Sequence, residues 1–184
     1  MTSGAEGRMF IEHIIFGIGI AILAGMMTRG PGERDHSWIV VAGAMAPDID
    51  ITVDLLHRAM PGVFVPGLVA LPLPFHGSFH TIGFLVLFAA GAGLILSRAG
   101  IGFATAALYA GIGSGSHLLE DALVGTFPGY PYLWPLSHER FMVPVFSGDW
   151  SWFGVANTET LTVALSLAAA AVLVRTAVRG PPWA

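Results

Sequence analysis

The sequence predicts an all-α membrane protein: a polytopic helical bundle of about five transmembrane helices in a single domain, residues 1–184. Of the 184 residues, 54% are hydrophobic and only 11% are charged, which lies outside the balance of ordinary soluble domains. The apolar residues gather in runs long enough to cross a bilayer as helices. The length leaves little chain for a separate soluble domain.

Five apolar runs are the predicted transmembrane helices. The first has nineteen residues, which at ~1.5 Å per residue cross a hydrocarbon core of ~30 Å. It carries Glu12 and His13 near its start and follows a single arginine, so we expect a retained span rather than a cleaved signal peptide. The five runs are Phe10–Thr28, Trp38–Leu56, Phe79–Leu96, Ile101–Leu119 and Val155–Val174.

The second run is apolar only as far as Ala46, and we expect Pro47 to end or kink its helix. Asp48 and Asp50 follow directly, and the kink would aim them into a cavity. The next apolar stretch, Val63–Phe75, is too short and too rich in proline to cross as a helix. It is therefore predicted to be a re-entrant or interfacial segment.

The fourth run is rich in glycine, at Gly111, Gly113 and Gly115. A phosphate-binding loop is one reading of such a run, but close packing of helices through small residues suits an apolar run better. The stretch Gly125–Phe153 is rich in proline, tryptophan, tyrosine and glycine. We expect it to form an amphipathic lid at the membrane interface.

Ionisable residues lie at alternating ends of the first four runs. Because the chain reverses at each crossing, these ends should meet on one face of the membrane, provided that Val63–Phe75 does not cross. His117 and Asp121 are four residues apart and project from the same face of a helix. The residues predicted to meet are His13, Asp48, Asp50, His76, His80, His117 and Asp121.

This set predicts a divalent metal site. The chain has no cysteine, so nitrogen and oxygen must hold the ion, which suits zinc, with manganese or iron as alternatives. The number of donors allows one or two ions. A metal ion activates water for hydrolysis of an ester, commonly a phosphoester, and an unpaired aspartate could act as general base. The interfacial depth and the predicted lid favour a lipid or lipid-linked substrate.

Several motifs resemble those of the YdjM-like family of inner-membrane metal-dependent hydrolases. They are Glu12-His13, residues 46–50, residues 76–81, residues 116–121 and residues 133–135, which cover about the first three quarters of the chain in order. The resemblance implies a multi-span helical fold and metal dependence. Carried over by motif, it makes all seven converging residues metal or catalytic residues, with Asp48, Asp50 and His76 as the catalytic set.

The sequence departs from the family pattern in three places, one of which is Ile51, where the family often has a histidine after Pro-Asp-x-Asp. The central family motif usually reads His-Arg-Gly-x-Thr-His-Ser, whereas here the two histidines are four residues apart and the arginine is missing. If that arginine contacts a substrate phosphate, Arg58 or Arg140 would have to replace it. Glu120 stands where an aliphatic or small residue is common, so it is predicted to be an added ligand or to face the lid. His138 is a further predicted substrate contact, with an exposed surface patch as the alternative.

Other classes of protein fit the same residues. A divalent metal transporter would need polar residues that continue along the helices to the opposite face of the membrane. The third, fourth and fifth runs are largely apolar beyond the site. A non-enzymatic scaffold would hold a structural metal or a hydrogen-bonded polar core. Nothing in the composition indicates nucleic-acid binding, and the small-residue faces would serve a homo-oligomer as well as the bundle.

Arginines give the predicted orientation. Five would lie on the face opposite the site and three on the site face, so the positive-inside rule points the site away from the cytoplasm. The first group is Arg29, Arg34, Arg98, Arg175 and Arg179, and the second is Arg8, Arg58 and Arg140.

Overall fold

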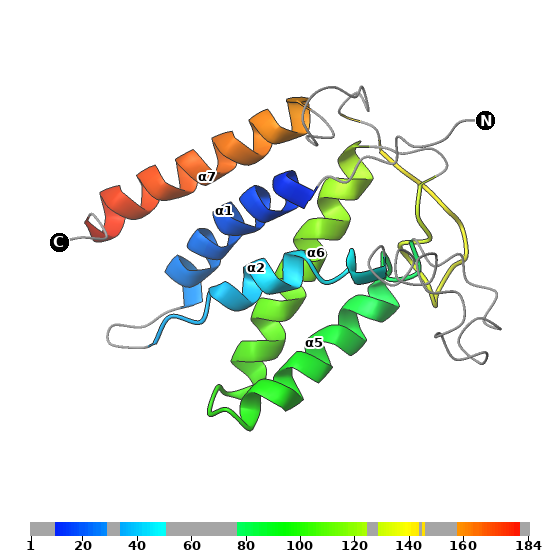
Figure 1. The fold of residues 1–184 in the computed structure, drawn as a ribbon, viewed down its shortest axis with the longest axis horizontal. Helices are drawn as coiled ribbons and strands as arrows, with labels where there is room; N and C mark the ends of the chain where they lie inside the picture. The colour runs from blue at the N-terminus through cyan, green and yellow to red at the C-terminus, as the bar shows by residue number, and fades with distance from the viewer. Residues whose placement is uncertain are drawn as a thin grey trace, which may run out of the picture.

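A computed structural model describes residues 10–28, 34–50, 77–124, 129–143, 145 and 158–180. Within these ranges the protein is all-helical, apart from an isolated bridge between Tyr130 and Phe141. The predicted all-α class is therefore confirmed for the described part of the chain. The helices are α1 (Phe10–Thr28), α2 (Trp38–Ala44), α5 (Ile82–Ser97), α6 (Phe103–Val124) and α7 (Thr158–Arg179) (Figure 1).

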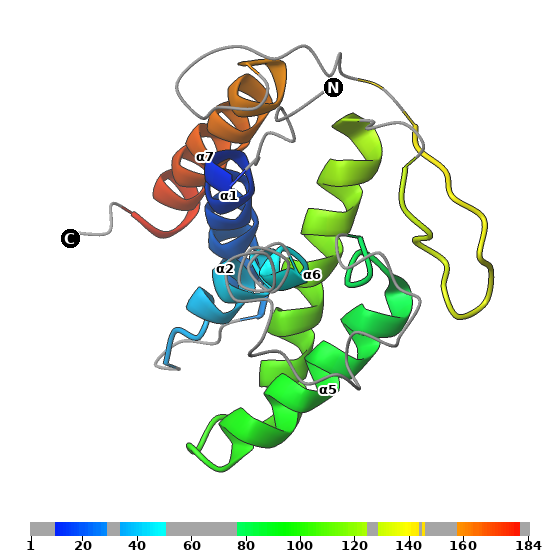
Figure 2. The same ribbon diagram turned by 45° about the vertical axis from the view of Figure 1, so that its right-hand side comes forward.

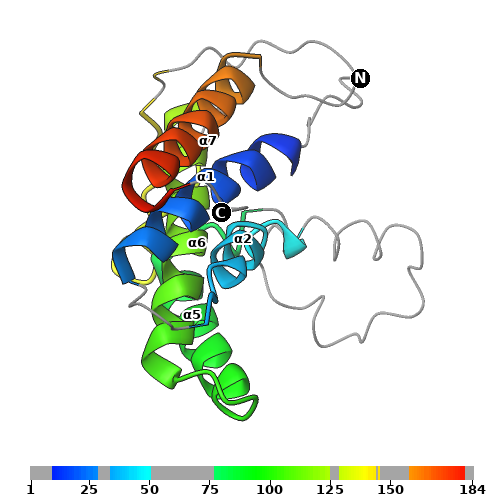
Figure 3. The same cartoon turned by 90° about the vertical axis from the view of Figure 1, so that its left-hand side faces the viewer.

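The helices lie in the order α7, α1, α2 with α6, and α5 from one edge of the molecule to the other (Figure 3). Helices α5 and α6 form an antiparallel hairpin, while α2 crosses α6 (Figures 1 and 2). Helices α1 and α7 run side by side in the same direction. At their C-terminal ends the Arg179 guanidinium donates to the Met26 carbonyl at 2.7 Å.

Two helices begin or end at clear local signals. Helix α2 ends at Ala44, just before Pro47, which confirms the predicted break. Helix α5 begins at Ile82 because the Thr81 side chain accepts a hydrogen bond from the Phe84 backbone N–H at 3.0 Å. His80 therefore lies in the turn before the helix, and the expectation that it lies on the span is wrong. Residues 51–56 of the second run and the segment Val63–Phe75 lie outside the described residues.

Membrane crossing is indicated most clearly for α7. Among the described helices, α7 alone is long and apolar enough to span a bilayer, and little of it is buried inside the protein. The apolar parts of α1 and α5, Ile11–Met27 and Ile82–Ser97, are shorter. The remaining crossings stay a prediction.

Glycine lets α2 and α6 approach closely. A Cβ atom at Gly113 would overlap the Val40 carbonyl, and one at Gly43 would lie 2.7 Å from the Ala110 carbonyl oxygen. The glycines of α6 thus pack against helices, as predicted from the apolar run. The core around this crossing comprises Ala21, Ala24, Ile39, Val40, Ala106, Tyr109 and Ala110.

Candidate metal centre

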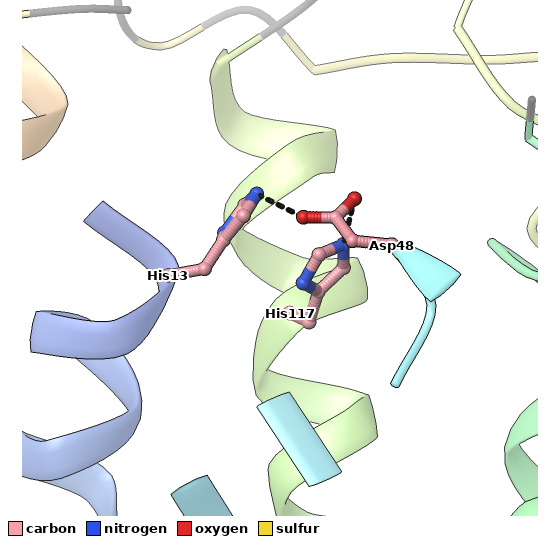
Figure 4. A group of neighbouring side chains, drawn as sticks. All are labelled: His13, Asp48 and His117. Atoms are coloured by element: carbon pink, nitrogen blue, oxygen red, sulfur yellow. Dashed lines mark ion pairs between the residues drawn. The ribbon is translucent and has the colours of Figure 1, made fainter. Parts of the chain in front are cut away.

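Four separate elements bring five ionisable side chains together. His13 comes from the first turn of α1, Asp48 from the turn after α2, His80 from the turn before α5, and His117 and Asp121 from the last turns of α6. Figure 4 shows His13, Asp48 and His117 pointing at one another. None of the five residues is more than 6% exposed. The alternating ends of the predicted runs therefore do meet in one place.

The three imidazoles turn their Nε2 atoms toward the two carboxylates. Asp121 Oδ2 lies 3.1 Å from Nε2 of His80 and 3.3 Å from Nε2 of His117, and Oδ1 lies 3.5 Å from Nε2 of His13. The oxygens of Asp48 lie farther from these three nitrogens, at 3.5, 3.7 and 3.9 Å respectively. Asp121 is therefore the central carboxylate of the cluster.

An oxygen lies behind each imidazole. Nδ1 of His117 lies 2.7 Å from the Ala44 carbonyl, and Nδ1 of His13 lies 2.9 Å from Glu120 Oε2. Nδ1 of His80 lies 3.5 Å from Asp50 Oδ2. A carbonyl can only accept, so His117 donates through Nδ1, and Nε2 of the neutral ring carries a lone pair. Outer acceptors of this kind are the usual support of metal-binding histidines.

The inner atoms fit a divalent cation. Nε2 of His117 lies 3.2 Å from Nε2 of His80, and two lone pairs at this distance repel unless a proton or a cation lies between them. Ligand atoms ~2.0–2.2 Å from a metal ion are roughly 2.8–3.6 Å apart. Two overlapping groups of the described residues bring their donor atoms within 4.8 Å of one another, close enough for modest side-chain shifts to reach this spacing, namely His13 with Asp48 and His117, and His80 with His117 and Asp121. The buried cluster could therefore bind a metal.

Two predicted site residues stand behind the histidines rather than among the inner atoms. Asp50 is buried, and its Oδ2 accepts hydrogen bonds from the backbone N–H groups of Gly77 at 2.8 Å and Phe79 at 3.4 Å. It thus fixes the turn that carries His80. Glu120 is also buried, and its Oε2 lies 2.9 Å from Nδ1 of His13, so it stands behind that histidine.

Two further predicted site residues are exposed rather than buried with the cluster. His138 and Arg140 are exposed on the segment 129–143, where the Arg140 guanidinium donates to the Gly129 carbonyl at 3.4 Å. His76 and Arg58 lie outside the described residues.

Sequence reasoning missed the Ala44 carbonyl and Tyr130. A backbone acceptor has no signature in a sequence, and Tyr130 lies in a stretch whose only signal was its aromatic and proline content. The Tyr130 ring stacks on His80, with the ring centroids 4.3 Å apart. Burial, followed by the charge of Asp121, raises the pKa of the Tyr130 phenol far above its ordinary value, so the hydroxyl keeps its proton.

The contact between Glu120 and His13 gives a testable prediction. Glu120→Leu removes the acceptor of His13 Nδ1, and metal affinity is expected to fall about 10- to 100-fold, as for other outer supports of metal ligands. Glu120→Gln keeps an acceptor oxygen and should lose less. Competition with a chelator measures both affinities. Ser114→Ala, at another buried polar residue of α6, is the control, and wild-type affinity in Glu120→Leu would contradict the assigned role.

Comparison with known proteins places the chain in a family. A family model described as YdjM inner membrane protein matches residues 9–181, a range that includes all described helices and all five converging side chains. No curated protein and no solved structure matches the chain. The match confirms the resemblance carried by the motifs, and the chain belongs to the YdjM inner membrane protein family.

Proposed function

We propose that this protein is a membrane-bound, metal-dependent hydrolase that cleaves an ester, preferably a phosphoester, of a lipid or lipid-linked substrate. One observation carries the proposal: three imidazole nitrogens and two carboxylates face one another, and an oxygen lies behind each imidazole. This donor set suits Zn²⁺, with Mn²⁺ or Fe²⁺ as alternatives. A cation bound there would supply a Lewis acid and a water of lowered pKa.

The distances favour one ion over two. The Nε2 atoms lie 3.1 to 3.9 Å from the carboxylate oxygens, close to the separations around a single ion. Two-metal sites hold their ions ~3.5–4 Å apart and need donors spread over a wider region. His117 belongs to both of the overlapping donor groups, which also supports a shared ion.

Asp48 is the better candidate for the general base. Its oxygens lie 3.5 to 3.9 Å from the three Nε2 atoms, whereas those of Asp121 lie 3.1 to 3.5 Å away. Catalytic zinc sites commonly use three protein ligands, so the five donors exceed what one ion needs, and a carboxylate can accept a proton from the attacking water. Asp48 stands on a turn rather than a helix, which suits the looser role.

The surroundings support a substrate that enters from the membrane. Leu136 and Trp134 are exposed apolar residues on the segment 129–143, and the Trp134 carbonyl accepts a hydrogen bond from the Gly83 N–H at the start of α5. This segment therefore places apolar side chains beside the cluster, where an amphiphile could approach.

We further propose five crossings with the site on the extracytoplasmic face. The parallel course of α1 and α7 is that expected of a first and a fifth crossing helix. The arginine count of the sequence supports the outward face.

Metal analysis of detergent-purified protein tests the proposal. Wild type is expected to retain about one zinc, manganese or iron ion per chain, as for a single site of this donor set, and His117→Ala and His13→Ala to lose it. His36→Ala, at a histidine before α2 and outside the cluster, should retain it.

The metal-loaded protein is then assayed on lipid phosphoesters and carboxylic esters. Hydrolysis that disappears in His117→Ala is the expected result. A wild type without metal after incubation with these ions would overturn the metal centre. If the protein retains metal but hydrolyses no ester, the hydrolase proposal is overturned, and a scaffold with a structural metal or a metal transporter becomes the explanation of the site.

A further inference from the structure

The segment 129–143 is hydrogen-bonded to both the start of α5 and the end of α6. Near the start of α5, the Ile82 N–H donates to the Tyr132 carbonyl at 2.8 Å. At the end of α6, the Val143 N–H donates to the Ala122 carbonyl at 2.8 Å. These hydrogen bonds hold the segment against the same ends of α5 and α6 from which His80 and Asp121 project.

Tyr130 is the residue of this segment that reaches the cluster. Its ring stacks on His80 at an interplanar angle of 29°, and the Tyr132 ring meets it edge-on at a centroid distance of 5.8 Å. Gly77 has φ +92°, and a Cβ atom there would lie 2.7 Å from Tyr130 Cδ1. The position of the ring is therefore fixed on three sides.

The chemistry of the site calls for a hydrogen-bond donor. The two inner carboxylates of Asp48 and Asp121 would offset the charge of a divalent cation bound between them, so the remaining oxygens of an anionic substrate need further positive charge or N–H and O–H donors. The described arginines do not supply this charge, because Arg140 is exposed and the others lie at the helix ends opposite the cluster. These other arginines are Arg34, Arg98, Arg175 and Arg179.

The Tyr130 hydroxyl is suited to this need. The ring is half-buried, so it lies between the buried histidines and the outside. The Tyr130 ring stacks on His80 with the ring centroids 4.3 Å apart, so the phenol lies directly beside a candidate metal ligand.

We propose that Tyr130 is a substrate-binding residue whose hydroxyl donates a hydrogen bond to an anionic oxygen of a phosphoester beside His80. The inference rests on the proposed hydrolase function and adds a residue of the lid segment to it. The substrate class follows from the chemistry: a phosphoester oxygen carries the charge that a single O–H donor stabilises best.

Tyr130→Phe tests the inference because it keeps the ring on His80 and removes only the hydroxyl. Tyr132→Phe is the matched control, because Tyr132 is a buried tyrosine of the same segment that packs on Tyr130 rather than on His80. Metal content and thermal unfolding should equal those of wild type in both variants. The affinity of the metal-loaded protein for inorganic phosphate, measured by calorimetry, should fall about 10- to 100-fold in Tyr130→Phe alone, as for a lost hydrogen bond to a charged group. The value of kcat/KM for a hydrolysed phosphoester should fall with it.

The outcomes separate this inference from the function on which it rests. If wild type holds metal and hydrolyses a phosphoester while Tyr130→Phe binds phosphate equally well, the inference is overturned and the hydrolase stands. An equal loss in Tyr132→Phe, or loss of metal in Tyr130→Phe, assigns the effect to packing and overturns it as well. If wild type neither holds metal nor binds phosphate, the proposed function fails and the inference with it.

Discussion

Asp121→Asn is expected to lower metal affinity by more than about 100-fold, beyond the loss caused by an outer support, and to abolish metal-dependent hydrolysis. Asp121 lies within 3.5 Å of all three Nε2 atoms. The substitution keeps the shape of the side chain but removes the negative charge that offsets a divalent cation. Its amide N–H₂ group would also face the nitrogens as a donor, in competition with the ion.

Asp50→Asn is the matched comparison for this variant. Asp50 is equally buried and approaches His80 from the opposite side, at Nδ1. An asparagine oxygen can still accept from the backbone N–H groups of the turn, so the loss of affinity should stay within about 10-fold, at the mild end for outer supports. Chelator competition gives both affinities, and thermal unfolding shows that both variants fold. Equal losses would contradict the distinction between inner and outer carboxylates.

Gly113→Ala is expected to destabilise the protein by about 1–3 kcal/mol, as for other overpacked cores. The added Cβ would overlap the Val40 backbone, which cannot move aside without shifting α2. Helix α2 carries the Ala44 carbonyl behind His117 and leads directly to Asp48. Metal affinity should therefore fall together with stability.

Gly111→Ala provides the contrast, two residues away on the same helix. A Cβ atom there would meet only the Ala89 Cβ, at 3.7 Å, which is ordinary contact. Replacing a helical glycine by alanine favours the helix by up to ~1 kcal/mol. In thermal unfolding measured in one detergent, the unfolding temperature should therefore fall below that of wild type for Gly113→Ala and rise above it for Gly111→Ala. A Gly113→Ala protein as stable as Gly111→Ala would show that the crossing of α2 and α6 is looser than its backbone contacts indicate.

The parts of the fold that the sequence predicts well are those with local causes. Apolar runs give the helices, Pro47 stops α2, and the alternation of polar residues between run ends brings the donors together. The apolar pattern predicts a start of α5 three residues before the observed one, because such a pattern does not show that Thr81 caps the helix.

The supporting contacts of the site depend on tertiary structure and could not be predicted in this way. His13 and Glu120 are 107 residues apart, and their contact depends on how α1 packs against α6. The Ala44 carbonyl depends on where α2 ends, and the stacking of Tyr130 on His80 depends on the course of the segment after α6. No periodicity or spacing in the chain encodes such distances.

The packing of α7 on α1 also bears on the order of synthesis. All five converging side chains lie between His13 and Asp121, and α7 begins only at Thr158. Because a chain emerges from the ribosome N-terminal part first, all five donor residues are made before α7. Helix α7 then joins a partner that already carries His13, with Gly19 of α1 leaving room for close contact at Ala168. Helix α7 therefore packs on α1 at a stage when the donor residues have all been synthesised.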